Sequence, residues 1–165
     1  MARHSLALAI TPEDLLAAAH EYCAWVEHAQ ADDRQAWLRE LSQLLAQLHA
    51  ALLMRQALPQ AQPLPLAQDL EARFTLFLRL KTILADDDVY WLEFDGAAPY
   101  ERSGSLAGDL TDIYFELHHA LTHLKDSPER CAAYLRCSFQ RLWGQHLLDA
   151  ERQLYRLQDP TRACR

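Results

Sequence analysis

The segment GSLAGDLTDIYFELHHALTHL, residues 104–124, indicates most directly which fold this chain adopts. Its apolar side chains recur every three or four residues, which is the spacing of one face of an α-helix. Ser105 stands just before the first of them and is a residue type that caps helix N-termini. The segment therefore predicts an amphipathic helix that buries one stripe against other helices. The stripe consists of Leu106, Leu110, Ile113, Leu117, Leu121 and Leu124.

Helical signals recur on both sides of this segment. The further predicted helices span residues 11–30, 34–58, 67–85 and 127–157. Thr11, Asp32 or Asp33, and Ser127 precede three of them and are suited to cap their N-termini. In the helix predicted over 67–85, we expect the buried face to be Leu70, Phe74, Phe77, Leu78 and Ile83.

The segments between the predicted helices define the domain organisation. Three prolines mark a linker over residues 57–66, because proline cannot continue a helix. Residues 86–104 form the one long irregular stretch, an acidic-aromatic loop with an extended piece expected at 89–94. The length of 165 residues suits one domain. We therefore predict an all-α fold, a single-domain bundle of about five helices over residues 1–165.

The charge of the chain narrows the classes of partner. A net charge of -7 disfavours nucleic acid and anionic membrane surfaces, both of which attract Lys and Arg. No stretch reaches the roughly 20 apolar residues of a membrane span. The four cysteines contain no C-x-x-C pair, and free thiols are typical of a cytoplasmic protein. These features favour an acidic cytoplasmic protein with another protein as its partner, and they leave a homodimer open.

A polar flank adjoins the apolar stripe of residues 104–124. It consists of Asp109, Asp112, Glu116, His119 and His123. His146 lies on the apolar face of the last predicted helix and needs a partner for its ring nitrogens once buried. In one interpretation the flank only satisfies His146 and is otherwise solvated. In the other, Asp109, Asp112 and Glu116 hold a divalent cation, and His146 or His119 acts as the catalytic base.

The acidic-aromatic loop is the second candidate site. Acidic and aromatic side chains are frequent in it, and large aromatic residues are frequent anchors of protein interfaces. The residues predicted to bind a partner are Asp86, Asp87, Asp88, Tyr90, Trp91, Phe94 and Tyr100. A lid folded back on the core is the alternative, because large aromatic side chains are mostly buried.

Three motifs, VYWLEFD at 89–95, GSLAGDLTDIY at 104–114 and FQRLWGQHLLDA at 139–150, resemble the bacterial family called domain of unknown function 5063. The resemblance covers the C-terminal half. It implies a small helical bacterial protein and assigns no activity. Besides residues already named as candidates, the signature on this chain includes Gly104, Ser105, Tyr114, Trp143 and Gly144.

Two functions follow from these observations. The first is a protein–protein interaction module, acting as an adaptor or regulator without a cofactor. The alternative is a metal-dependent hydrolase of small phosphorylated or nucleotide substrates. Asp109-x-x-Asp112 is similar to one acidic motif of all-helical nucleoside triphosphate pyrophosphatases, but the chain lacks the Glu-x-x-Glu of the other motif. The sequence therefore favours the interaction module and leaves enzymatic activity open.

Overall fold

The computed structural model describes residues 11–30, 33–53, 64, 69–92 and 102–158. The helices are α1 (Pro12–Glu27), α2 (Arg34–Leu53), α3 (Leu70–Leu84), α4 (Leu106–His123), α5 (Pro128–Ser138) and α6 (Gly144–Leu157). A 3-10 turn at Ala85–Asp87 follows α3, and a π-helical turn at Phe139–Trp143 joins α5 to α6. The two strands are β1 (Val89–Leu92) and β2 (Arg102–Ser105). The all-α prediction is confirmed, with α5 and α6 forming the single last helix that was expected.

Helices α1, α2 and α4 begin at the N-cap residues that the sequence predicts. The Thr11 side chain accepts a hydrogen bond from the main-chain N–H of Asp14, and Pro12 occupies the first helical turn. Of the two aspartates considered for α2, Asp33 accepts from main-chain N–H groups in the first turn. Ser105 accepts from the N–H of Gly108 at 3.1 Å. These caps pair donors that a helix N-terminus otherwise leaves free.

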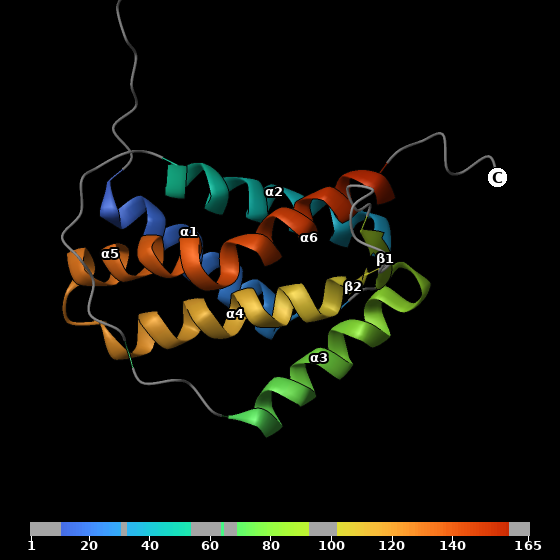
Figure 1. Cartoon of the computed structure of the whole chain (residues 1–165), viewed down its shortest axis with the longest axis horizontal. Coiled ribbons are helices and arrows are strands. Elements are labelled where there is room, and N and C mark those ends of the chain that lie inside the picture. Colours follow the sequence, from blue (N-terminus) through green and yellow to red (C-terminus); the bar gives the residue numbers. More distant parts are fainter. Residues whose placement is uncertain (1–10, 31–32, 54–63, 65–68, 93–101, 159–165) are drawn as a thin grey trace, which may run out of the picture.

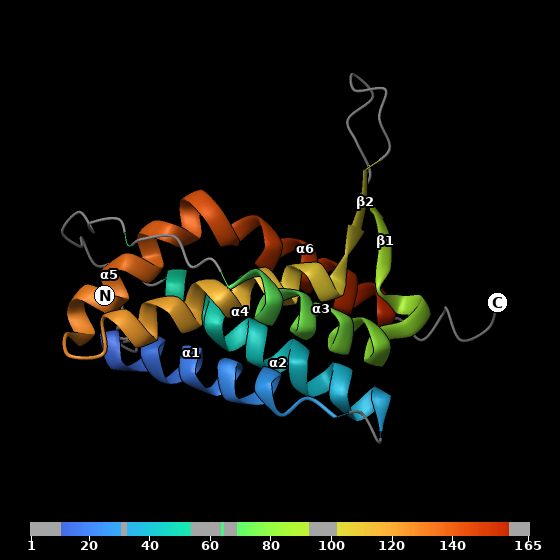
Figure 2. The ribbon, with the colours of Figure 1, turned by 90° about the horizontal axis from the view of Figure 1, so that it is seen from below.

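Helix α4 lies at the centre of the bundle. It packs against α1, α3, α5 and α6, while α2 packs on α1 and α6. Figures 1 and 2 show α1, α2, α4 and α6 running along the long axis of the molecule. The described helices share one hydrophobic core, with Leu41, Leu80, Leu110, Leu117 and Trp143 among its fully buried side chains. None of the described helices is long and apolar enough to cross a membrane.

The acidic-aromatic stretch is more regular than expected. Its ends form an antiparallel hairpin in which Tyr90 faces Gly104 and Val89 faces Ser105. The hairpin projects from one end of the bundle (Figure 2). Residues 93–101, including Phe94 and Tyr100, lie outside the described residues, as do most of the residues of the 57–66 linker.

The last helix contains a π turn that the sequence did not predict. The N–H of Gly144 bonds to the carbonyl of Phe139, five residues earlier. A Cβ at Gly144 would lie 2.4 Å from that carbonyl oxygen, which is too close for any side chain. Trp143 is fully buried at this turn and donates from Nε1 to the Ser138 hydroxyl at 2.9 Å. The glycine thus permits the turn that aligns α6 with α4.

The predicted buried face of α3 is wrong for Leu70, Phe74 and Leu78, whereas Phe77 and Ile83 pack against the core. The buried residues of the helix are Leu76, Leu80 and Leu84. Leu70 and Phe74, which were expected inside, are 75% and 61% exposed. Helix α3 runs obliquely to the bundle, so that its first turns stand away from α4 (Figure 1). An apolar stripe therefore lies open to solvent on this helix.

Candidate functional site

The polar flank of α4 forms a hydrogen-bonded network around Asp109. This carboxylate is buried, with 7% of the residue exposed. One of its oxygens accepts from the Tyr90 hydroxyl of β1, and the other lies 2.8 Å from Nδ1 of His146 on α6. Burial raises the pKa of Asp109, and the bonds from His146 and Tyr90 oppose that shift. Asp109 thus connects the hairpin to α4 and α6.

His146 links Asp109 to a second carboxylate. Its Nε2 lies 3.4 Å from an oxygen of Asp112, whose other oxygen pairs with Arg73 of α3. The hydrogen bond to Asp109 raises the pKa of His146, and the charge of Asp112 adds to that effect. We call this series the α4 network: Tyr90, Asp109, His146, Asp112 and Arg73. It joins β1, α3 and α6 to one face of α4.

The α4 network favours a stabilising role for His146. A general base needs a ring nitrogen within reach of the substrate proton. Here both ring nitrogens face carboxylates, although the side chain is 37% exposed. A protonated imidazole would bridge Asp109 and Asp112 as an ion pair. Asp109 and Asp112 thus satisfy His146, as the first interpretation of the flank expected, but His119 is buried and not solvated.

Two of the three carboxylates proposed for a divalent cation are already bonded. Asp109 and Asp112 direct their oxygens to Tyr90, His146 and Arg73. Across the part of the chain that the structure describes, no group of three His, Cys, Asp or Glu side chains is arranged to hold a metal ion. Glu116 is half-buried near Arg73, and burial raises its pKa. The metal site stays a prediction of the sequence alone.

The other predicted catalytic residue lies farther along α4. His119 is seven positions beyond Asp112, which is about 10 Å along a helix. Its ring packs against that of His123 at 4.1 Å between centroids. The structure therefore places His119 away from the carboxylates of the α4 network.

The residues predicted to bind a partner separate into two groups. Asp88 and Tyr90 are buried, so in this structure they face the protein interior. Asp88 accepts from the Ser105 hydroxyl at 2.9 Å and from the N–H of Ala107 at 2.7 Å, and thereby holds the first turn of α4. Trp91 is 60% exposed. Of the remaining members, Asp86 is exposed and Asp87 pairs with Arg34 of α2.

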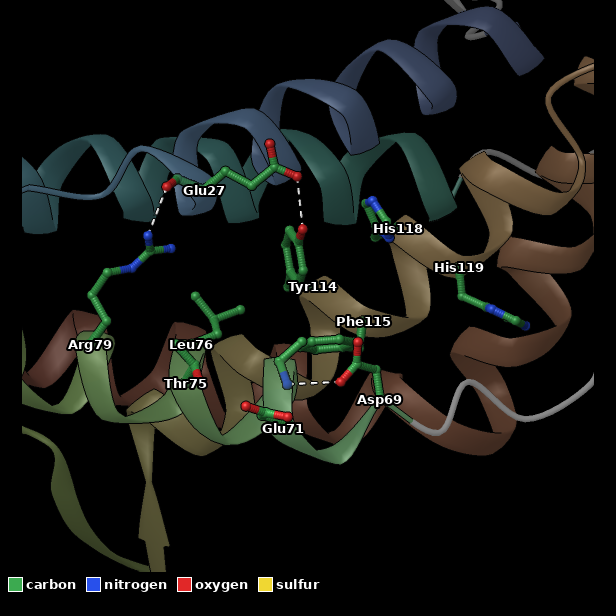
Figure 3. Close-up of a pocket in the computed structure, with 11 residues that line it drawn as sticks. Glu27, Asp69, Glu71, Thr75, Leu76, Arg79, Tyr114, Phe115, His118 and His119 are labelled. Carbon is green, nitrogen blue, oxygen red and sulfur yellow. Dashed lines mark hydrogen bonds between the residues drawn. The ribbon is translucent and has the colours of Figure 1, made fainter.

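Two grooves lie on opposite sides of α3. The smaller, of about 300 Å³, is the α3–α4 groove, lined by Leu70, Arg73, Phe74, Phe77, Gly108, Thr111 and Asp112. The larger, of about 610 Å³, lies between the end of α1, α3 and the middle of α4 (Figure 3). We call it the acidic groove, because Glu27, Asp69 and Glu71 line it. Arg73 and Asp112 are the network residues that line the α3–α4 groove.

The sequence matches the family described as Domain of unknown function (DUF5063) over residues 11–159. The protein belongs to this family. The match extends well beyond the C-terminal half on which the three motifs lie. Four of the five residues of the α4 network lie in the three sequence motifs quoted above. They are Tyr90, Asp109, Asp112 and His146.

The fold is similar to that of protein BF1032 from Bacteroides fragilis, as seen in its crystal structure. The two chains are 23% identical with a TM-score of 0.72, and the similarity covers 89% of this chain and 94% of that one. At this identity the likeness concerns the fold alone. No curated protein matches the sequence.

Sequence reasoning missed residues whose partners lie on other elements. Arg73 pairs with Asp112, and Arg79 donates to the main-chain oxygens of Val26 and Glu27. Tyr22 is fully buried and donates from its hydroxyl to the carbonyl of Leu110 at 2.9 Å. Its place in the apolar stripe of α1 was a usable signal, because a buried hydroxyl requires a partner.

Proposed function

We propose that this protein is a protein–protein interaction module whose docking surface is the open apolar side of α3. The observation that carries the proposal is the exposure of Leu70, Phe74 and Leu78, which share one side of the helix. We call these residues, with the half-buried Phe77, the α3 face. Contiguous exposed apolar side chains on a helix mark interaction sites more often than isolated ones do.

The α3 face borders a groove. Phe74 and Phe77 stack with ring centroids 6.5 Å apart. Together with Leu70 they line the α3–α4 groove, whose volume is about 300 Å³. Aromatic and aliphatic residues beside such a groove are typical anchors of interfaces. Trp91 on the hairpin is a further exposed aromatic side chain.

Charge favours a basic partner over a second copy of the chain. The chain carries a net charge of -7, so two copies repel each other at long range. Arg73, which lines the α3–α4 groove beside the α3 face, is already paired with Asp112. We therefore infer that the partner is another protein, whose docking segment carries apolar side chains flanked by Lys or Arg.

Substitution of the α3 face tests this proposal. The double variant Phe74→Ser/Leu78→Ser should retain the melting temperature, because both residues are exposed. Tyr155→Ser on α6 is the matched control, since Tyr155 is also exposed and apolar. A partner captured from native extract with the wild-type chain is purified, and its affinity for each variant is measured by calorimetry. We expect the double variant to lose about tenfold or more in affinity and the control to lose none.

Four outcomes would count against the proposal. Equal affinity of the double variant would remove the α3 face from the interface, and loss of binding in Trp91→Ala alone would place the interface on the hairpin. A dimer in light scattering that the double variant converts to a monomer would show that a second copy covers the face. Failure to retain any stoichiometric partner would count against the interaction module itself.

A further inference from the structure

The acidic groove is a cavity that lies outside the proposed docking surface. Its volume of about 610 Å³ lies within the range of small-molecule sites. Of its α3 residues, Ala72, Leu76 and Arg79 lie on the side of the helix away from the α3 face, whereas Glu71 lies at the edge of that face. Thr75 and Leu76 line the groove from α3, and Tyr114 and Phe115 line it from α4 (Figure 3).

The wall of the groove is aromatic. The rings of Tyr114 and His118 stack with centroids 5.4 Å apart and an interplanar angle of 18°. Phe115 meets the Tyr114 ring edge-on at 5.1 Å. The Tyr114 hydroxyl donates to a carboxylate oxygen of Glu27 at 2.7 Å, which fixes the ring between α1 and α3 (Figure 3). The faces of such rings attract cations.

The charges that line the groove are mostly negative. Glu27, Asp69 and Glu71 contribute carboxylates, whereas Arg79 is the cation among the lining residues. Both terminal nitrogens of the Arg79 guanidinium donate to main-chain oxygens at the end of α1, at 2.9 Å each. Arg79 is thereby directed to the negative end of the α1 dipole. The groove is left with an excess of negative charge beside an aromatic wall.

We propose that the acidic groove binds a small organic cation, with an ammonium or guanidinium head near the carboxylates and an apolar stem against Tyr114 and Leu76. The carboxylates provide the charge complement, and Tyr114 provides the cation–π contact, since the Arg73 guanidinium already lies over the Phe115 ring at 5.1 Å from its centroid. This site is independent of the docking surface proposed for the α3 face.

Agmatine is a suitable probe, because it carries a guanidinium and an ammonium group on a short apolar chain. Binding to the full chain is followed by chemical-shift changes in NMR spectra, with uncharged N-butylurea as the comparison ligand. The test variant is Asp69→Asn/Glu71→Gln, since Asn retains the helix cap that Asp69 provides. Its matched control is Glu13→Gln/Glu129→Gln, which removes two exposed first-turn carboxylates outside the groove.

We expect agmatine to shift the signals of Thr75, Leu76 and Tyr114, and to bind more tightly than N-butylurea. The test variant should weaken binding by about fivefold or more and the control by less than about twofold. An Arg-containing tripeptide serves as a second arm: tighter binding than agmatine at the same residues would support the site and identify a protein side chain as its source. Equal affinity of test and control variants, or equal binding of N-butylurea, would overturn the proposal.

Discussion

The protonation of His146 gives the α4 network a pH dependence. The hydrogen bond to Asp109 raises the pKa of His146 above its ordinary value of 6.5. The folded chain therefore holds this proton more tightly than the unfolded chain does. The resulting stabilisation is fully present below pH 6.5 and is lost as the pH rises through the raised pKa. Burial raises the pKa of Asp109, which gives a change of the same sign at lower pH.

We expect the free energy of unfolding to fall by less than about 1 kcal/mol as the pH rises through this range, because the imidazole is partly screened by solvent. Urea unfolding at a series of pH values measures the change. His146→Asn should remove most of the dependence on the alkaline side of pH 6.5. A variant that kept the wild-type profile would show that another group titrates there.

Gly104 and Gly108 should respond in opposite ways to substitution by alanine. A Cβ at Gly104 would lie 2.2 Å from Cζ of Tyr90, whose hydroxyl is held by Asp109. Gly104→Ala should therefore destabilise the fold by about 1–3 kcal/mol. A Cβ at Gly108 meets the Ser105 hydroxyl oxygen at an ordinary 3.4 Å. Gly108→Ala should stabilise α4 by about 0.5–1 kcal/mol, because alanine is the better helix former.

Chemical denaturation of the two alanine variants provides the measurement, and each variant controls for the other. Both add one methyl group in the same region of the chain. Equal effects of the two substitutions would contradict the close approach of Tyr90 to Gly104.

At the scale of the element, the hairpin is attached to α4 through Asp88. Its carboxylate accepts hydrogen bonds from the Ser105 hydroxyl and from the N–H of Ala107. Its main-chain oxygen accepts from the N–H of Leu106 at 2.8 Å. Asp88→Ala would leave buried donors without a partner. We expect a loss of about 2–3 kcal/mol in the free energy of unfolding.

The exposed Asp86 on the same turn is the control for this substitution. Asp86→Ala should change the stability by less than about 0.5 kcal/mol. Thermal melting and hydrogen exchange at residues 106–108 would report the loss of the cap. Normal protection of these amides in Asp88→Ala would show that the hairpin is not attached in this way.

At the scale of the whole molecule, metal ions distinguish the two functions derived from the sequence. The carboxylates of Asp109 and Asp112 already bond to Tyr90, His146 and Arg73. We therefore expect melting temperatures that do not change between EDTA and Mg²⁺, Mn²⁺, Zn²⁺ or Ca²⁺. A bound ion at 100 times its dissociation constant would add about 2.7 kcal/mol and raise the melting temperature by several degrees.

The variant Asp112→Asn completes that series of melts. A metal-specific rise in the wild type that Asp112→Asn abolishes would support the hydrolase and require the α4 network to open. The same rise in melting temperature in the wild type and in Asp112→Asn would place a metal elsewhere on the protein. Either result would redirect the search from a protein partner to a substrate.

Much of the fold follows from short-range signals. The caps at Thr11, Asp33 and Ser105 act within three residues of the chain, so they can be recognised without knowledge of the tertiary structure. The apolar stripe of α4 is also local, because a helix fixes which side chains share a face. Both features were predicted correctly. The polar flank was found for the same reason, but its partners were not.

The sequence by itself determined where α1, α2, α4 and α5 begin and which face of α4 meets the core. Tertiary structure decided which stripe of α3 is buried, because that helix carries apolar residues on two sides and its neighbours contact only the one containing Leu80. It also decided the partners of Asp109, since Tyr90 and His146 are 19 and 37 residues away. Helical spacing places side chains on a face. Only the packing of separate elements determines which side chains meet across it.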